Sequence, residues 1–217
     1  VLRVNGEPRS SIIADPEDGQ VPYTLWGKGQ FYWKAYRMMS RHNNPEERPL
    51  GERCTVGFGS TGGPPMLPVL YNNNYQFMQT TDQWLILVEM NHNVRNIRLN
   101  AQPLPQAVRP WMGDSIGHWE GDTLVVETTN FSPMQEEAAI SLTSDAQVVE
   151  RFTRVSDEQI VYEFSVEDPT YYSQPWHGEL SFLSTPSKVY EFACHEGNYA
   201  MSGILAGARR AEHDQQQ

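Results

Sequence analysis

The chain has 217 residues and a formal net charge of −11, with 27 acidic and 16 basic side chains. A single domain is the default at this length, and such a chain can bury a sizeable core without cross-links. The acidic balance argues against nucleic acid and anionic membrane surfaces, because no basic patch offsets it, and the apolar run WLILV is too short to insert as a membrane span.

The first third of the chain predicts an arm, a helix and a long loop. Residues 1–25 contain Asp-Pro, Asp-Gly and Val-Pro turn signals and are expected to be extended. Residues 43–74 form a connection whose Gly/Pro-rich part, 57–68, cannot be helical, and long irregular loops inside a domain are often functional. Between them, residues 24–42 predict a helix that ends at the Asn-Asn-Pro sequence 43–45, because four apolar residues recur at helical spacing: Phe31, Ala35, Met38 and Met39.

The remaining two thirds alternate between short strands and turns. Residues 75–99 read as three strands joined by turns at 80–83 and 91–93. Three further hairpins are predicted over 118–131, 148–166 and 177–193, with turns at 120–122, 156–158 and 185–187. Residues 198–210 are expected to form a last helix, followed by a frayed tail.

This succession predicts an all-β fold of about eight to ten strands with one helix before and one after. Short sequential hairpins favour an antiparallel up-and-down β-barrel of the lipocalin or calycin kind, with the C-terminal helix packed outside, and a β-sandwich is the alternative. One domain is expected overall. Residues 1–73, comprising the arm, the helix and the Gly/Pro-rich loop, would pack on a barrel formed by residues 74–217.

The turn at 91–93 carries the densest chemistry. If Asn-His-Asn is a three-residue loop, Glu89 lies opposite Arg95 on one sheet face, with His92 at the apex. Such a pair could simply fix the strand register. Because desolvation opposes an ion pair on an apolar face, Glu89 and Arg95 could instead orient a ligand, or hold His92 as a catalytic acid or base.

A histidine from the end of the chain could join this turn. His195 is the best partner for His92, and together they would supply acid/base catalysis or bind a divalent metal with a nearby carboxylate such as Glu89, Glu127 or Glu196. No HExxH or other tight metal spacing is present, so the ligands would have to come from distant strands. The alternative is that His92 is a surface residue with ordinary hydrogen bonds and no role in catalysis or metal binding.

Tryptophans and one strand carboxylate are the candidate ligand-binding residues. Trp84, Trp119 and Trp176 could provide stacking surface for an aromatic ligand or a saccharide, although strands are rich in aromatic residues in any case. Glu127 could point into the barrel with a raised pKa or could face solvent, and the strand pattern does not decide between these.

The two cysteines, Cys54 and Cys194, permit one long-range disulfide, but their spacing does not require it. His195 is adjacent to Cys194, yet neighbouring strand residues point to opposite faces, so this pair does not resemble a thiol nucleophile with its base. No GxSxG motif supports a serine hydrolase.

Several sequence blocks resemble a large group of uncharacterised exported bacterial proteins: GPPMLP, EMNHNVR, WEGDTLVVETTNF and ACHEGNY. The resemblance extends from about residue 10 to residue 209. It implies a secreted or periplasmic location, with a secretion signal and a further segment before Val1, and therefore a bridge between Cys54 and Cys194. It implies no activity.

Three functions are consistent with these observations. The first is a secreted or periplasmic enzyme that acts on a small molecule or glycan by acid/base chemistry, as a lyase, isomerase or hydrolase. The second is a non-catalytic, lipocalin-like binding protein for an aromatic or apolar small molecule. The third is a structural or partner-binding protein of the cell envelope. No nucleotide-cofactor motif is present, and the barrel interior would discriminate between the three.

Overall fold

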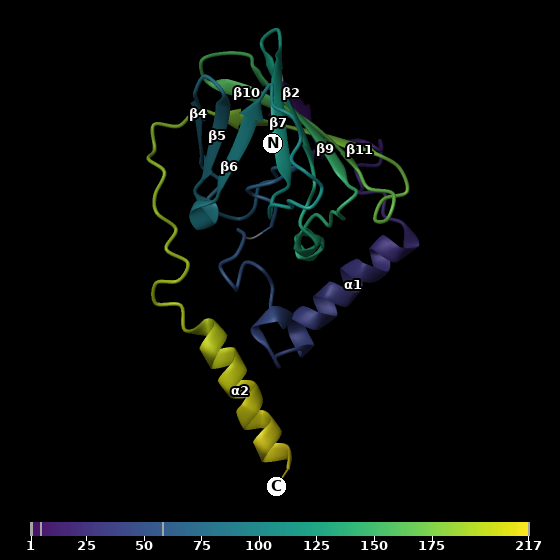
Figure 1. The fold of residues 1–217 in the computed structure, drawn as a ribbon, viewed down its shortest axis with the longest axis vertical. Coiled ribbons are helices and arrows are strands. Elements are labelled where there is room, and N and C mark those ends of the chain that lie inside the picture. The colour runs from purple at the N-terminus through teal and green to yellow at the C-terminus, as the bar shows by residue number, and fades with distance from the viewer. Residues whose placement is uncertain (1, 5, 58, 217) are drawn as a thin grey trace.

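One curved nine-stranded sheet dominates the structure (Figure 1). The structure is a computed structural model that describes residues 2–4, 6–57 and 59–216. A separate hairpin pairs β1 (Leu2–Val4) with β2 (Glu7–Arg9). Short 3₁₀ turns lie at η1 (Pro45–Glu47), η2 (Met90–His92) and η3 (Pro133–Glu137). The sheet strands are β3 (Ile13–Asp15), β4 (Tyr75–Gln79), β5 (Gln83–Val88), β6 (Val94–Leu99), β7 (Asp114–Glu120), β8 (Thr123–Thr129), β9 (Gln147–Arg154), β10 (Gln159–Glu167) and β11 (Trp176–Leu183).

The strand order is β3-β11-β10-β9-β8-β7-β6-β5-β4, which confirms a mostly β protein. Every neighbouring pair is antiparallel except β6 and β7, which run parallel. The Pro-rich loop between β6 and β7 carries the chain back so that β7 runs beside β6 in the same direction, as a parallel pair requires. The simple up-and-down succession is therefore broken at this point, and the described strands do not form a closed barrel.

The sheet nevertheless curls until its two ends approach each other. Tyr75 and Phe77 on the edge strand β4 contact Phe182 on β11, with ring centroids 5.1 and 5.7 Å apart, although β4 and β11 lie near opposite ends of the strand order. Alternate residues of each strand point to the enclosed side, and they form the core of the protein.

The predicted N-terminal helix is confirmed as α1 (Leu25–Ser40). It begins where the Thr24 hydroxyl accepts a hydrogen bond from the amide of Gly27 at 2.9 Å. Gly27 is its one buried residue, and the expected apolar stripe does not face a core: Phe31, Met38 and Met39 are 57, 47 and 71% exposed. The helical spacing of apolar residues predicted the helix correctly, but it did not show whether the apolar face packs against the core.

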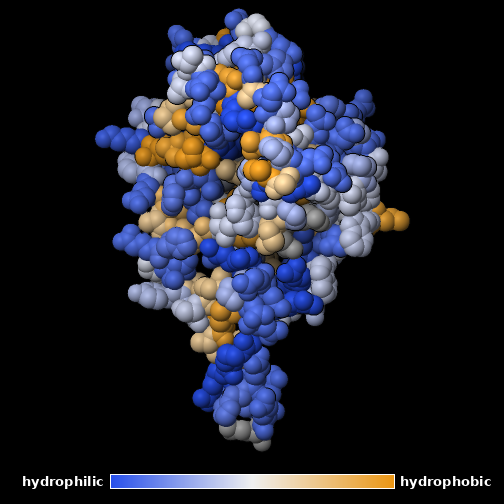
Figure 2. Space-filling model, in the orientation of Figure 1, coloured by the Kyte–Doolittle hydropathy of each residue, from blue (hydrophilic) through white to orange (hydrophobic). Residues whose placement is uncertain are grey.

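The second helix, α2 (Ala200–Gln215), continues five residues beyond the predicted end and includes most of the tail expected to fray. It extends away from the sheet (Figure 1), and the visible surface over its C-terminal end is hydrophilic (Figure 2). Arg209 ties it to the loop after α1, donating to the carbonyl of Asn43 at 3.0 Å. The prediction that this helix packs on the outside of a barrel is therefore wrong. No described helix has the length and apolar character of a membrane span.

The hairpins predicted over 118–131 and 148–166 are confirmed by β7–β8 and β9–β10. The last predicted hairpin is wrong in its second strand, because residues 188–193 pair with no strand in the described chain. The partner of β11 on that side is β3, from the arm that was predicted to be extended but was not assigned to the sheet. Its three residues were too few to show an alternating pattern.

A buried ion pair crosses the enclosed side of the sheet. The Arg95 guanidinium on β6 donates to both carboxylate oxygens of Glu150 on β9, at 2.9 and 2.6 Å, and both side chains are almost fully buried. The phenol of Tyr162 donates to the same carboxylate at 2.7 Å, and the Ser115 hydroxyl lies 3.4 Å from Arg95. These contacts offset part of the cost of taking two charges out of water.

The Gly/Pro-rich loop has no helix among its described residues, as predicted, and it packs into the structure beside this pair. Residues 61–66 are all buried, and the amide of Met66 donates to the Tyr162 hydroxyl at 2.8 Å. The left-handed φ of +64° at Gly63 would be strained for a residue with a side chain. Part of the interior is therefore occupied by a loop without regular secondary structure.

Replacing Glu150 with Ala is expected to lower the free energy of unfolding by about 3–5 kcal/mol, because Arg95 would remain buried without its counter-charge. Denaturant unfolding measures this change. The matched control is Glu163→Ala, since Glu163 is exposed on the next strand and should tolerate truncation with little effect. Equal losses in the two variants would contradict a special role for the buried pair.

Candidate functional site

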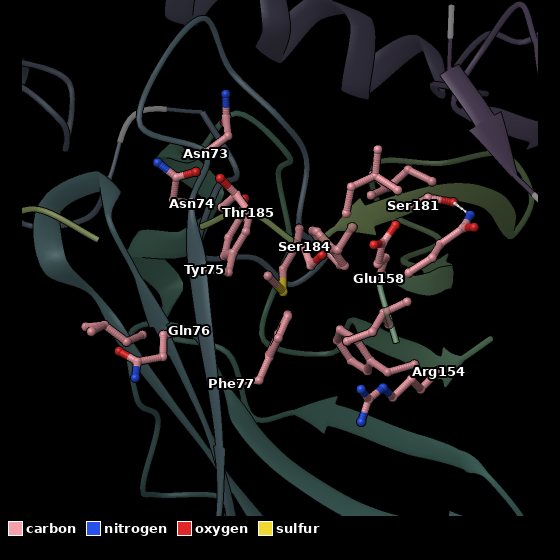
Figure 3. A pocket seen from close by; sticks show the side chains of 18 of the residues that line it. Asn73, Asn74, Tyr75, Gln76, Phe77, Arg154, Glu158, Ser181, Ser184 and Thr185 are labelled. Atoms are coloured by element: carbon pink, nitrogen blue, oxygen red, sulfur yellow. Dashed lines mark hydrogen bonds between the residues drawn. The ribbon is translucent and has the colours of Figure 1, made fainter. Parts of the chain in front are cut away.

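A cleft of about 1310 Å³ opens at one end of the curled sheet (Figure 3). One wall is the edge strand β4 with the residues just before it, and the opposite wall is formed by the adjoining ends of β9, β10 and β11. Residues 184–189, which leave β11, complete the mouth. The cleft exceeds the roughly 300–1,000 Å³ typical of small-molecule sites, so it has room for a ligand and ordered water.

The cleft is lined on its inner side by aromatic rings that pack on one another. Phe77 stacks on Trp84 with centroids 5.0 Å apart, and Phe152 meets Trp84 edge-on at 4.9 Å. Trp84 and Phe152 are 7 and 3% exposed, so only parts of their rings face the cleft. Burial raises the pKa of the Tyr75 phenol, and Arg95 opposes this rise. The result is a rigid apolar lining with neutral polar atoms at its edge.

Polar and charged side chains surround this lining. Gln159 donates to the Ser181 hydroxyl at 2.8 Å, the contact drawn in Figure 3. Tyr75 and Phe77 from β4 lie across the cleft from Glu158 and Arg154 in the same view. Arg154 is partly committed to Asp157, with the nitrogen and oxygen 3.1 Å apart. The mouth therefore offers hydrogen-bonding groups and charges of both signs.

The predicted ligand-binding residues divide into two groups. Trp84 and Trp119 both line the cleft, and Trp119 is 44% exposed. Trp176 does not line it: this residue is 1% exposed and packs against Phe164 and Tyr172 in the core. Glu127 is exposed on the opposite face of the sheet from the core, so the inward carboxylate considered from the sequence is wrong.

The predicted pairing of Glu89 with Arg95 is also wrong. Leu87 faces Val94 and Ile86 faces Arg95, so the turn is longer than three residues and Glu89 belongs to it. Asn91 and His92 have left-handed φ values of +57° and +40°, so the chain reverses through non-helical backbone within η2 in place of a tight hairpin loop.

Glu89 has other partners. Its carboxylate is 3% exposed and accepts from the Asn74 side-chain amide at 2.6 Å and from the backbone amide of Tyr190 at 3.1 Å. Asn74 lines the cleft, so Glu89 supports the site from behind and does not itself line it.

His92 and His195 do not meet in a shared pocket. The His92 ring is 2.9 Å from the carbonyl of Phe192, so Nδ1 must carry the proton that is donated. His195 lines a separate hollow with Pro45, residues 52–55, Asn198 and Met201. The described residues include no group of three or more His, Cys, Asp or Glu side chains that could hold a metal ion. Catalysis or metal binding by these histidines stays a prediction.

The disulfide between Cys54 and Cys194 is confirmed, with their Cα atoms 5.8 Å apart. Cys194 is therefore not a free thiol. The bond joins the loop before the Gly/Pro-rich segment to the segment that leaves the cleft mouth, and it lies beside the turn that carries Glu89 and His92. Asn91 donates to the carbonyl of Cys54 at 3.4 Å.

Several residues of the site were missed from the sequence. Phe77, Phe152 and Phe182 line the cleft, and each lies on the inward side of an alternating strand, so the alternation could have identified them. Glu150 occupies the inward position between Val148 and Phe152, where a carboxylate signals a buried partner. The contribution of residues 184–189 has no such signal, because it depends on long-range contacts.

No known protein family, curated protein or solved structure matches this chain. The chemistry of the site is therefore judged by its own geometry. An apolar lining with a polar mouth suits binding of an amphipathic molecule, and none of the cleft residues forms the nucleophile-and-base pair of a covalent catalyst among its described hydrogen bonds.

Burial raises the pKa of Tyr75, Tyr162 and Tyr172 above the ordinary value for tyrosine. These phenols hold their protons in the folded protein while unfolded tyrosine ionises near pH 10, so the stability that they contribute is full below about pH 10 and falls above it. Near-ultraviolet phenolate absorbance should show the exposed tyrosines ionising first and these three only as circular dichroism reports unfolding. Simultaneous ionisation of all ten tyrosines in folded protein would contradict this expectation.

Proposed function

We propose that this protein binds a small amphipathic molecule whose apolar or aromatic part lies on the rings of the cleft. The observation that carries the proposal is the cleft of about 1310 Å³ with Phe77, Trp84 and Phe152 along its inner side. An apolar lining supplies affinity through buried area, and a few polar groups at the mouth orient the ligand. The side-chain amide of Asn74 and the hydroxyl groups of Ser184 and Thr185 are placed to perform the second task.

The binding function is better supported than the acid/base enzyme. The titratable groups of the cleft, apart from Tyr75, lie at its mouth: Asp122, Arg154, Asp157, Glu158 and Lys188. A general acid or base works best where water is excluded and a second group orients it. The residues first considered for catalysis, Glu89, His92, Arg95 and His195, do not line the cleft.

The binding proposal includes a finer view of the fold and the location. The contacts of Tyr75 and Phe77 with Phe182 support an incompletely closed, lipocalin-like barrel whose open seam is the cleft. The Cys54–Cys194 disulfide supports an oxidising compartment, either the periplasm or the outside of the cell. A saccharide that stacks on the exposed ring of Trp119 is a further ligand to test in the same cleft.

N-phenyl-1-naphthylamine, an uncharged fluorescent aromatic, is a suitable probe. The protein should bind it with saturable fluorescence enhancement. Trp119→Ala should weaken binding by about three- to tenfold, because part of the apolar contact area is lost. Trp111→Ala is the matched control, since Trp111 is similarly exposed at 39% but does not line the cleft. Unchanged affinity in Trp119→Ala, or an equal loss in the control, would contradict binding in this cleft. Displacement of the probe by an oligosaccharide would favour the saccharide.

A further inference from the structure

The segment after β11 forms part of the cleft and is called the strap, defined as residues 184–194. It has no strand pairing, and five of its residues line the cleft mouth: Ser184, Thr185, Ser187, Lys188 and Val189. The strap faces Tyr75 and Asn74 across the mouth, as Figure 3 shows for Ser184 and Thr185. One wall of the site is therefore a single extended segment without a sheet to support it.

The strap is held at its two ends. At its start the amide of Ser184 donates to the carbonyl of Glu158 at 2.8 Å. Towards its other end the amide of Tyr190 donates to the Glu89 carboxylate at 3.1 Å, and the carbonyl of Phe192 accepts from the His92 ring at 2.9 Å. Between these points, in residues 185–189, the described hydrogen bonds are local, from the amide of Ser187 to the hydroxyl of Thr185.

Glu89 connects the strap to the opposite wall. One carboxylate oxygen accepts from the strap at Tyr190, and the other accepts from the side chain of Asn74, at the start of the β4 wall. The amide of Glu89 also donates to the carbonyl of Asn74 at 3.0 Å. A single buried carboxylate thus fixes the separation of two walls at one end of the cleft.

The disulfide adds a covalent anchor directly after these hydrogen bonds. Cys194 is bonded to Cys54, and the loop that follows Cys54 is itself held by the same turn, where the Asn93 side chain accepts from the amide of Gly57 at 3.0 Å. Residues 89–93 therefore hold the strap both directly and through the loop to which it is cross-linked.

We propose that the strap is a tethered wall of the ligand site and that Glu89 and His92 are positioning residues that hold it against the ligand. The inference rests on the proposed binding function. It predicts that removing Glu89, His92 or the disulfide loosens the strap and weakens ligand binding while the aromatic lining stays intact, because none of these three anchors lines the cleft.

Two measurements on each variant of the full chain test the proposal. Hydrogen–deuterium exchange of a peptide that covers residues 185–193 reports how well the strap is held. Titration with N-phenyl-1-naphthylamine reports the affinity of the cleft. The variants are His92→Ala, Glu89→Ala and the double change of Cys54→Ser with Cys194→Ser. His177→Ala and Glu163→Ala are matched controls, since both residues are exposed and lie outside the cleft.

Loss of one anchoring hydrogen bond should accelerate exchange in the strap and raise the Kd of the probe, each by about three- to tenfold. Glu89→Gln should recover part of the effect of Glu89→Ala, because an amide oxygen can still accept from one of the two donors. Glu89 is buried, so its truncation could unfold the protein. His92→Ala covers that case, since the His92 ring is exposed and leaves no cavity in the core.

Unchanged exchange in the strap of His92→Ala and of the disulfide variant would overturn the anchoring role. Faster exchange with unchanged affinity would show that the strap is not a wall of the binding site, and would overturn the inference while leaving the binding function in place. Failure of the unmodified protein to bind the probe or any oligosaccharide would count against the proposed function itself, and exchange would still report on the anchors.

Discussion

The buried pair of Arg95 and Glu150 organises the interior of this protein. It joins strands that are not neighbours in the sheet, so its bidentate geometry can form only when the sheet has curled to one particular extent. A slip of one residue in β6 or β9 would turn one charge outward and leave the other buried alone, which is far more costly than a shifted apolar contact. On one side of the pair along β9 lies the core residue Val148, and on the other lies Phe152, in the lining of the cleft. The buried ion pair thus lies between the packed core on one side and the cleft on the other.

The turn at residues 89–93 has a comparable role at the periphery. Its side chains contact three different segments: Glu89 accepts from Asn74, Asn91 donates to Cys54, and His92 donates to Phe192. A carboxylate, a histidine and an arginine close together in sequence suggest catalysis, yet here each has a separate partner and none lines the cleft. Groups that can both donate and accept, or that carry charge, are as useful for joining irregular segments as for chemistry.

The limits of the sequence interpretation follow from the same contacts. Hairpins such as β7–β8 and β9–β10 were predictable, because alternation and turn residues are local signals. The Glu89–Arg95 register was not, because one extra turn of 3₁₀ geometry depends on loops that pack against the turn from elsewhere. The pairing of β11 with β3 and the position of the strap also depend on distant parts of the chain. Both are fixed by contacts with residues more than a hundred positions away in the sequence. Of the residues that line the cleft, Trp84 and Trp119 were proposed from residue type, whereas the strap had no local signature.

The cleft combines two kinds of wall, and this combination bears on selectivity. The rings along its inner side are packed against one another and against the core, so a ligand cannot change their positions without a cost to the packing of the whole domain. The described hydrogen bonds of the strap between its anchors are local, so its adjustment would cost less than a change in the lining. If the protein binds a ligand as proposed, the lining would select it by shape and the mouth would accommodate the rest of it. On the same proposal, the turn and the disulfide would limit how far the mouth adapts, since they hold the end of the strap and do not line the cleft.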